Sequence, residues 1–143
     1  MYLLKYFAGI LSAIYTNKPM LGVDIMNITD YQLNENIVLV LDGEFDAAAV
    51  KKNQLVFENA LEKNDVDILV DFSYVNFIDS SGVGVLVFMY KRLKSKNRKL
   101  VMIGLDGQPL KLIQMLRIDK TIESCKFLHT FISSDQELVK AHG

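Results

Sequence analysis

Two adjacent hydroxyl side chains, Ser80 and Ser81, stand between a short apolar run and a stretch of helical periodicity. The apolar run at residues 68–72 suits a buried strand, and the apolar positions from Val83 to Leu93 recur at the spacing of a helix. The first N–H groups of a helix lack intrahelical partners, so serine and aspartate oxygens accept hydrogen bonds from them, and the helix dipole favours an anion there. A serine at this junction can therefore serve as a helix cap or as a phosphate acceptor.

Acidic side chains lie at two turns that each lead from a predicted strand into a predicted helix. Asp42, Glu44 and Asp46 lie in a turn before a predicted helix, and Asp79 directly precedes Ser80. Because both turns follow strands, we expect them at the same end of the sheet, where paired carboxylates could perform acid–base chemistry. Local capping is the simpler interpretation, with Asp46 at the start of the helix that begins at Ala47 and Asp79 as a cap or brace of the serine turn.

Other catalytic patterns are incomplete in this chain. The glycines at residues 82–84 lack the third glycine of a dinucleotide fingerprint, because that position is Val87. A nucleophile elbow around Ser80 would need a glycine where Ile78 stands, and both histidines lie near the end of the chain. We therefore expect no enzyme activity, no cofactor and no metal site.

The hydrophobic pattern predicts the elements that position these residues. We expect strands near residues 24–33 and 37–41 paired as a hairpin, a helix over 47–63, a strand at 67–72 and the helix from Ser81. There follow a strand at 99–104, a helix from Gln108, a last strand near 126–128, and a capping box at 134–137 that starts a helix to about residue 141. This order predicts an α/β domain with a mixed central β-sheet flanked by helices.

The amino-acid composition limits the kinds of partner that the protein is expected to bind. The chain has 143 residues, half of them hydrophobic, and a net charge of −1, which suits one domain and gives no sign of disorder or nucleic-acid binding. The cations between Lys91 and Lys99 complement the negative end of the predicted helix, and no aromatics interleave with them for base stacking. A single cysteine, Cys125, favours a reducing compartment, so we expect a cytoplasmic protein.

Residues 1–25 form an extension ahead of the predicted domain. Their apolar positions recur at helical spacing and are Leu3, Leu4, Phe7, Ile10, Leu11 and Ile14. The stripe is too short to span a bilayer and lacks a signal-peptide cleavage pattern, and its polar face is not strongly basic, which disfavours a membrane-surface role. We expect an amphipathic helix that docks on the domain or between two copies in a homodimer.

The stretch of residues 70–93 resembles the anti-sigma factor antagonists, the stand-alone members of the STAS domain family, in which an Asp-Ser-Ser-Gly-x-Gly element follows the third strand. Residues 41–46 look like the family's Gly-x-Leu-Asp turn, and residues 100–104 and 109–116 look like its next strand and helix. The resemblance predicts a single STAS-type domain over residues 26–143. One departure is at Arg117, Ile118 and Asp119, where the family more often has a small residue and glycine.

The resemblance implies a role for each residue of the turn. In the family the first serine is phosphorylated, which implies Ser80 as the acceptor, with Ser81 as the alternative. At 100° per residue, Val85, Phe88 and Arg92 fall away from the side of the helix expected to meet the core, which predicts a docking ridge. The expected core-facing residues are Val83, Leu86, Val87 and Tyr90. The expected partner-binding residues are Asp46, Asp79, Ser80, Ser81, Gly82, Val85, Phe88 and Arg92.

The combined hypothesis is a partner-switching regulator. The unphosphorylated domain would bind a serine kinase or anti-sigma-type protein, phosphorylation at Ser80 would release it, and a serine phosphatase would reset it. Two alternatives stay open on the sequence: a non-phosphorylated soluble STAS subunit that docks on a membrane transporter, and a nucleotide-binding sensor that uses the loops of Asp46 and Ser80.

Overall fold

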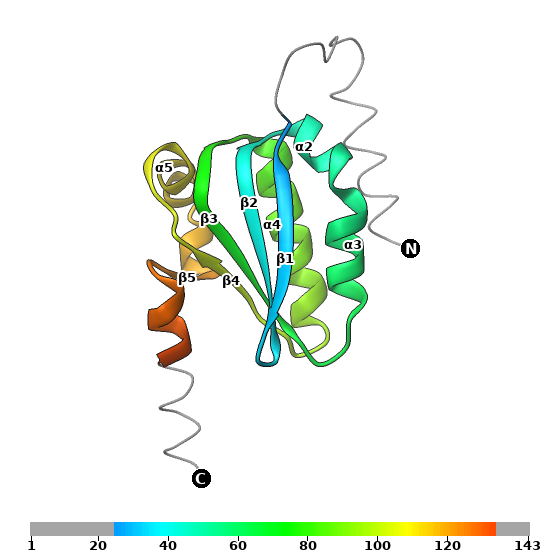
Figure 1. Ribbon diagram of the computed structural model, residues 1–143. Coiled ribbons are helices and arrows are strands. Elements are labelled where there is room, and N and C mark those ends of the chain that lie inside the picture. The colour runs from blue at the N-terminus through cyan, green and yellow to red at the C-terminus, as the bar shows by residue number, and fades with distance from the viewer. Residues whose placement is uncertain (1–24, 134–143) are drawn as a thin grey trace.

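The computed structural model describes residues 25–133 (Figure 1). The helix predicted in the N-terminal extension lies outside the described residues, apart from Ile25. The helix predicted from Ser134 onward lies outside them entirely. The elements are β1 (Asn27–Leu33), β2 (Asn36–Phe45), α2 (Ala47–Lys52), α3 (Gln54–Glu62), β3 (Asp67–Ile78), α4 (Ser80–Lys94), β4 (Leu100–Ile103), α5 (Gly107–Met115), the 3-10 helix η1 (Ile118–Lys120) and β5 (Glu123–Cys125).

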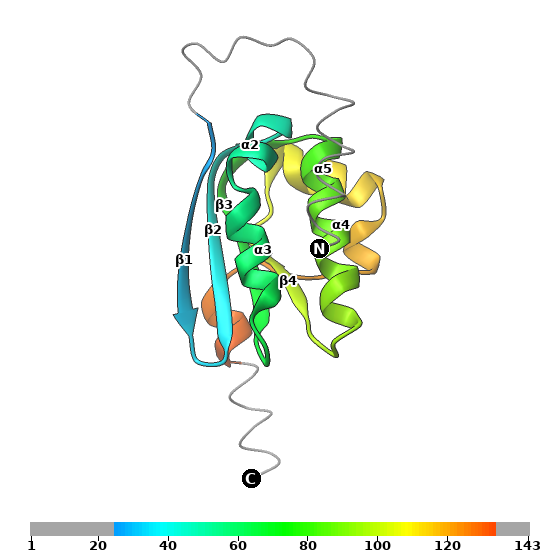
Figure 2. The same cartoon turned by 90° about the vertical axis from the view of Figure 1, so that its right-hand side faces the viewer.

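The five strands form one mixed sheet in the order β1-β2-β3-β4-β5. β1 and β2 form the predicted antiparallel hairpin, and every later neighbour pair is parallel. Right-handed crossovers between strands that follow one another across a sheet place their helices on one face. Figure 2 accordingly shows α2, α3, α4 and α5 on the same side of the sheet, which confirms the predicted α/β architecture.

The two central strands are longer than the hydrophobic pattern predicted. β2 continues to Phe45 and β3 to Ile78, with register shifts between Val40 and Asp42 and between Gly43 and Glu44. Gly43 has a φ of 125°, and an added Cβ would lie 3.0 Å from the Cα of Met26. Because the two strands stay paired through these shifts, they include polar residues that the hydrophobic pattern assigned to loops.

The helix predicted over residues 47–63 is broken in two at Asn53. The Asn53 side chain is buried, and its Nδ2 donates hydrogen bonds to the carbonyl oxygens of Ala49 and Met26, both at 3.0 Å. A buried amide with two carbonyl acceptors ends α2 and ties it to the residue that precedes β1. Apolar periodicity alone could not reveal this break.

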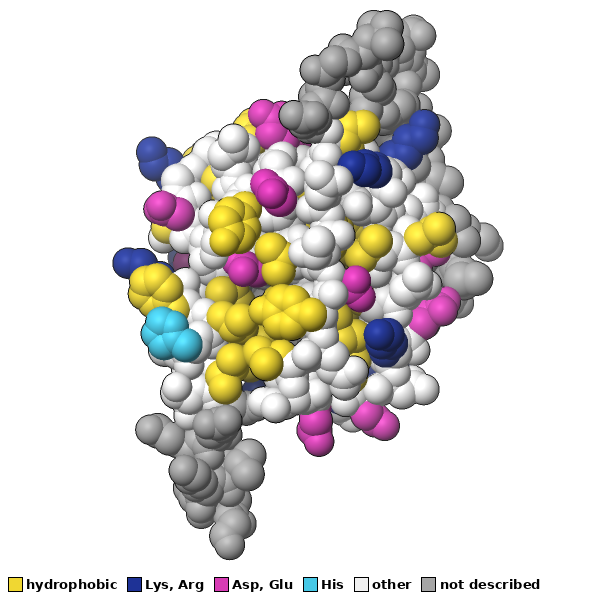
Figure 3. Space-filling view, viewed as in Figure 1, with side chains coloured by type: hydrophobic (Ala, Val, Ile, Leu, Met, Phe, Trp, Pro, Cys, Tyr) yellow, Lys and Arg dark blue, Asp and Glu magenta, His cyan; other side chains and the backbone are white. Residues whose placement is uncertain are grey.

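The main core lies between the sheet and the helices. Phe45 stacks on Phe57 with ring centroids 5.8 Å apart and lies 6.3 Å from Phe72. A smaller cluster lies on the other face, where Leu128 and Phe131 pack over the sheet. Figure 3 looks onto this face and shows apolar side chains gathered over its middle.

The end of the described chain differs from the prediction. The last strand is β5 at Glu123–Cys125 rather than at residues 126–128, and residues 128–133 are already helical. The reason is the spacing of Leu128 and Phe131, which puts both on one side of a helix over the small cluster. The unusual Arg117 has a φ of 59°, the left-handed conformation that a glycine adopts without strain, so the turn after α5 forms without a glycine.

Candidate functional site

Two aspartates cap neighbouring helices at one end of the sheet. Asp46 follows β2, and its carboxylate accepts a hydrogen bond from the N–H of Ala49 at 3.0 Å. Asp79 follows β3, and its carboxylate accepts from the N–H groups of Ser81 at 2.8 Å and Gly82 at 3.3 Å. These contacts confirm the capping interpretation for both residues.

The two turns are also joined directly. The backbone N–H of Asp79 donates to the carbonyl oxygen of Phe45 at 3.3 Å. Phe45 is the last residue of β2 and immediately precedes the other cap, Asp46. The two caps therefore hold a fixed position relative to one another, as expected where parallel strands end at the same edge of a sheet.

The two serines of the turn have opposite environments. Ser80 is the first residue of α4 and is exposed, and the capping hydrogen bonds come from Asp79 rather than from its hydroxyl. Ser81 is 2% exposed, and its Oγ is buried without a hydrogen-bond partner among the described residues. The Ser80 hydroxyl is thus accessible and not required for the fold, whereas Ser81 would have to leave the core to react.

Gly82 brings the first turn of α4 close to the strands. A Cβ at this position would lie 2.5 Å from the carbonyl oxygen of Phe45 and 2.9 Å from Cγ1 of Ile78. Contacts this short are incompatible with any side chain unless the helix moves away. Gly82 is itself buried, so it acts by positioning Ser80 rather than by presenting a surface.

Gln108 holds the strand that leads into the turn. The N–H of Ile78 donates to Oε1 of Gln108 at 2.8 Å, and Nε2 of Gln108 donates to the carbonyl oxygen of Ile78 at 2.9 Å. The pairing of β4 with β3 ends at Asp71, so the Gln108 amide supplies the paired bonds that a strand would make there. Sequence reasoning missed this role, because a glutamine near a predicted helix start carries no distinct signal.

The predicted docking ridge on α4 needs a correction. Val85 is 0% exposed and lies in the main core with Leu86 and Met89, so its assignment to a partner surface is wrong. The helical wheel placed Val87 and Tyr90 on the core-facing side of the helix, but both are only partly buried. The close approach at Gly82 turns the Val85 side of the helix inward.

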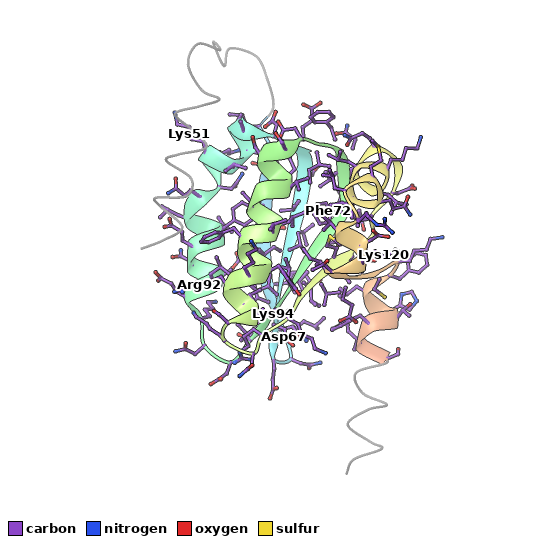
Figure 4. All side chains as sticks on the ribbon, turned by 180° about the vertical axis from the view of Figure 1, so that it is seen from behind. Lys51, Asp67, Phe72, Arg92, Lys94 and Lys120 are labelled. Atoms are coloured by element: carbon purple, nitrogen blue, oxygen red, sulfur yellow. The ribbon has the colours of Figure 1, made fainter. Side chains whose placement is uncertain are left out.

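The rest of the ridge lies at or near the surface. Phe88 is partly buried against the core, and Arg92 is exposed. Figure 4 shows Arg92 on the side of α4 that faces α3, while Lys94 lies on its other side. The ridge therefore reduces to Phe88 and Arg92 along one flank of the helix that carries Ser80.

The edge of the sheet that carries Ser80 is acidic. Asp46 follows β2, Asp79 follows β3, and Asp106 follows β4 as the residue that precedes α5. Since β2, β3 and β4 are parallel, these three carboxylates lie at the same end of the sheet. The N-terminus of α4 favours an added anion at Ser80, and the neighbouring carboxylates oppose it.

None of the helices within residues 25–133 is long and apolar enough to cross a membrane. The same residues contain no group of three or more His, Cys, Asp or Glu side chains that could hold a metal ion.

Comparisons with known proteins agree with this fold. Residues 27–136 match the family model of the STAS domain. The chain is 28% identical over 89 residues to an anti-sigma-B factor antagonist of Listeria monocytogenes, an alignment that spans 62% of this chain and 78% of the relative. The chain therefore belongs to the STAS domain family, and within that family it is similar to anti-sigma factor antagonists.

Solved structures of other proteins share this fold. An anti-sigma factor antagonist from Mycobacterium paratuberculosis has a TM-score of 0.70 at 16% identity, covering 76% of this chain and 92% of its own. The Bacillus cell fate determinant SpoIIAA in its phosphorylated form has a TM-score of 0.60 at 21% identity, covering 76% of this chain and 98% of its own. The same architecture thus occurs in a protein solved with its phosphate in place.

Proposed function

We propose that this protein is a partner-switching regulator whose switch is Ser80. The unphosphorylated domain binds a serine kinase or anti-sigma-type protein in the cytoplasm, phosphorylation of Ser80 releases it, and a serine phosphatase restores the binding form. The observation that carries this proposal is the contrast between the exposed Ser80 and the buried Ser81 at the start of α4.

Charge explains why phosphorylation would end binding without unfolding the domain. A phosphate adds about −1.5 to −2 charges at neutral pH. The N-terminus of α4 tolerates that charge, since the positive end of the helix dipole favours anions. Asp46 and Asp79 lie beside it, so the turn becomes strongly negative, and a partner surface matched to a neutral hydroxyl loses complementarity.

The partner surface consists of exposed and supporting residues. Ser80, Phe88 and Arg92 line the α4 side of this surface, and Asp46 and Asp79 supply its negative charge. Ser81 and Gly82 support the turn from beneath. The role is regulatory rather than catalytic, because the site offers a modified hydroxyl and a charged surface.

Phosphorylation by a candidate partner serine kinase tests the proposal. The full chain, Ser80→Ala and Ser81→Ala are incubated with kinase and ATP, and intact mass is measured. Wild type and Ser81→Ala should gain one phosphate, and Ser80→Ala should gain none. Ser81→Ala is a matched control, since it removes a buried hydroxyl that has no partner among the described residues.

Three outcomes would contradict the proposal. The first is equal labelling of Ser80→Ala and wild type, and the second is labelling that maps to Ser81. The third is a rise in melting temperature with nucleotide alone and no labelling, which would indicate a nucleotide sensor instead.

A further inference from the structure

The face of the sheet opposite α2, α3, α4 and α5 is only partly covered. Residues 128–133 are helical and place Leu128 and Phe131 over the small cluster. Beyond them the face is open, and it carries two exposed aromatic side chains, Tyr31 on β1 and Tyr74 on β3. Figure 3 shows apolar side chains across the middle of this face, acidic side chains among them, and Lys and Arg towards its margins. Exposed aromatic residues are enriched in surfaces that bind other proteins.

One carboxylate interrupts the apolar side chains of this face. Asp71 on β3 pairs with Val40 of β2 on one side and with Ile103 of β4 on the other. Ile103 is buried, and Val40 and Asp71 are partly buried. Oδ1 of Asp71 accepts a hydrogen bond from the N–H of Ser73 at 2.9 Å, and Asp71 forms no ion pair with any of residues 25–133. A partly buried carboxylate with unused acceptor positions favours a cation supplied from outside.

A hollow of about 350 Å³ lies beside this carboxylate. It is lined by Asp71 and Ile103 from the sheet, and by Phe127 and His129 from the segment that follows β5. The rings of Phe127 and His129 stack with their centroids 5.4 Å apart. Nζ of Lys126, which also lines the hollow, lies 5.5 Å from the centroid of the Phe127 ring and is not paired with Asp71. The hollow therefore offers a carboxylate on one wall and aromatic rings on the other.

Tyr31 approaches the same carboxylate from β1. Burial and the negative charge of Asp71 both raise the pKa of the Tyr31 phenol, yet the side chain is still 42% exposed. Tyr74, three residues beyond Asp71 on β3, is 64% exposed. A guanidinium group is planar, stacks on aromatic rings and donates two parallel hydrogen bonds to a carboxylate, which an ammonium group does not do. The arrangement of these groups therefore suits arginine better than lysine.

We propose that the open face of the sheet binds a segment of a partner protein that presents an arginine between apolar residues. The surface, which we call the Asp71 patch, consists of Tyr31, Asp71, Tyr74 and Phe127. The occupant is argued from charge complementarity, because an unpaired carboxylate set among apolar and aromatic side chains matches a guanidinium flanked by apolar groups. The patch lies on the opposite face of the sheet from α4, so a protein bound there leaves the Ser80 turn accessible (Figure 2). Binding at the patch does not depend on phosphorylation of Ser80.

Titration of the isotope-labelled full chain with the peptide acetyl-Leu-Arg-Leu-amide tests the patch. The amide NMR signals of residues 71–74 and 127–129 should shift and saturate. The same peptide with citrulline, a neutral analogue of arginine with nearly the same shape, should bind at least about tenfold more weakly because the charge-assisted hydrogen bonds are lost. Equal binding of the two peptides, or no saturable shift with the arginine peptide, would overturn the proposal.

Two matched variants locate the binding. Asp71→Asn keeps an oxygen that can accept from Ser73 and removes the charge, and it should weaken binding of the arginine peptide at least about tenfold. Asp30→Asn makes the same change of charge on β1, on the side of the sheet that faces α3, and should bind like wild type. Equal losses in the two variants would indicate unspecific charge attraction and overturn the proposal.

A further variant and a dilution series complete the test. Tyr74→Ala removes an exposed ring, so it should weaken binding of the arginine peptide about threefold while the melting temperature stays unchanged. Unchanged affinity in this variant would overturn the aromatic part of the patch. Without peptide, the signals of residues 71–74 should not depend on protein concentration. A concentration-dependent shift of these signals would indicate a second copy of the chain as the occupant and overturn the proposal.

Discussion

The turns at Asp46 and Asp79 have the same backbone and different consequences. Both aspartates have φ of −115° and ψ of −172°, and each caps the helix that follows a parallel strand. After Asp46 come three alanines, of which Ala47 and Ala49 are buried, and the helix has six residues. After Asp79 come Ser-Ser-Gly, the first residue is exposed, and the helix has 15 residues.

The difference between the two turns shows which features of the Asp79 turn go beyond helix capping. Both turns satisfy the first N–H groups of a helix, so capping cannot distinguish a switch from a structural turn. The turn of Asp79 adds an exposed hydroxyl at the first helical position and a helix long enough to develop a dipole. It also has a glycine where the other turn has Ala49, and a Cβ at this glycine would meet the carbonyl oxygen of Phe45.

The largest expected effect on stability is that of a substitution at Gly82. Gly82→Ala should lower the free energy of unfolding by about 3 kcal/mol, because its Cβ would meet the carbonyl oxygen of Phe45. The reciprocal variant Ala49→Gly should cost less, about 2 kcal/mol, from lower helix propensity and the loss of one buried methyl group. Urea denaturation of both variants measures this, and equal losses would contradict the close packing inferred for α4.

A second experiment separates the inward and outward sides of α4. Val85→Ala should lower the free energy of unfolding by about 2 kcal/mol, because Val85 lies in the core. Phe88→Ala should weaken partner binding by about 2 kcal/mol and reduce stability less than a fully buried phenylalanine would. Denaturation curves beside binding isotherms separate the two, and unchanged partner affinity in Phe88→Ala would remove Phe88 from the interface.

The caps themselves have a smaller effect. Asp79→Ala and Asp46→Ala should each cost about 1 kcal/mol of stability, with the larger loss at Asp79, which accepts two hydrogen bonds rather than one. The corresponding asparagine variants keep a capping oxygen and serve as controls. Changes at Asp79, which directly precedes Ser80, should alter the rate of Ser80 phosphorylation more than changes at Asp46. An equal effect from Asp46 would mean that the kinase contacts both turns alike.

The smallest effect is expected at the second serine. Ser81→Ala should change the free energy of unfolding by less than about 0.5 kcal/mol, since it removes a buried hydroxyl without a partner among the described residues. Thermal unfolding measured beside Ser80→Ala provides the comparison. A loss of several kcal/mol would show that the Ser81 hydroxyl makes a hydrogen bond in solution.

The parts of the fold that depend on local pattern were predictable. The hairpin, the order of strands and helices, and the caps at Asp46 and Asp79 follow from periodicity and from the residue types that satisfy helix ends. The resemblance to anti-sigma factor antagonists implied Ser80 as the phosphate acceptor through its motif, and the exposure of Ser80 is consistent with that assignment.

The parts that depend on long-range contacts were not predictable. Asn53 breaks a helix because its amide reaches Met26, and Gln108 holds Ile78 across a span of 30 residues. Val85 turns inward because Gly82 lets α4 approach the strands. Each outcome depends on a partner distant in the sequence, which a helical wheel or a propensity does not include.

The central claim is that a phosphate on Ser80 changes binding without changing the fold. The most direct measurement is the affinity of the full chain for its kinase or anti-sigma partner before and after stoichiometric phosphorylation, with the melting temperature recorded for both forms. The phosphorylated form should bind at least about tenfold more weakly, a difference of about 1.4 kcal/mol, while it melts within a few degrees of the unmodified form. Equal affinity of the two forms, or loss of binding that coincides with unfolding, would contradict the account.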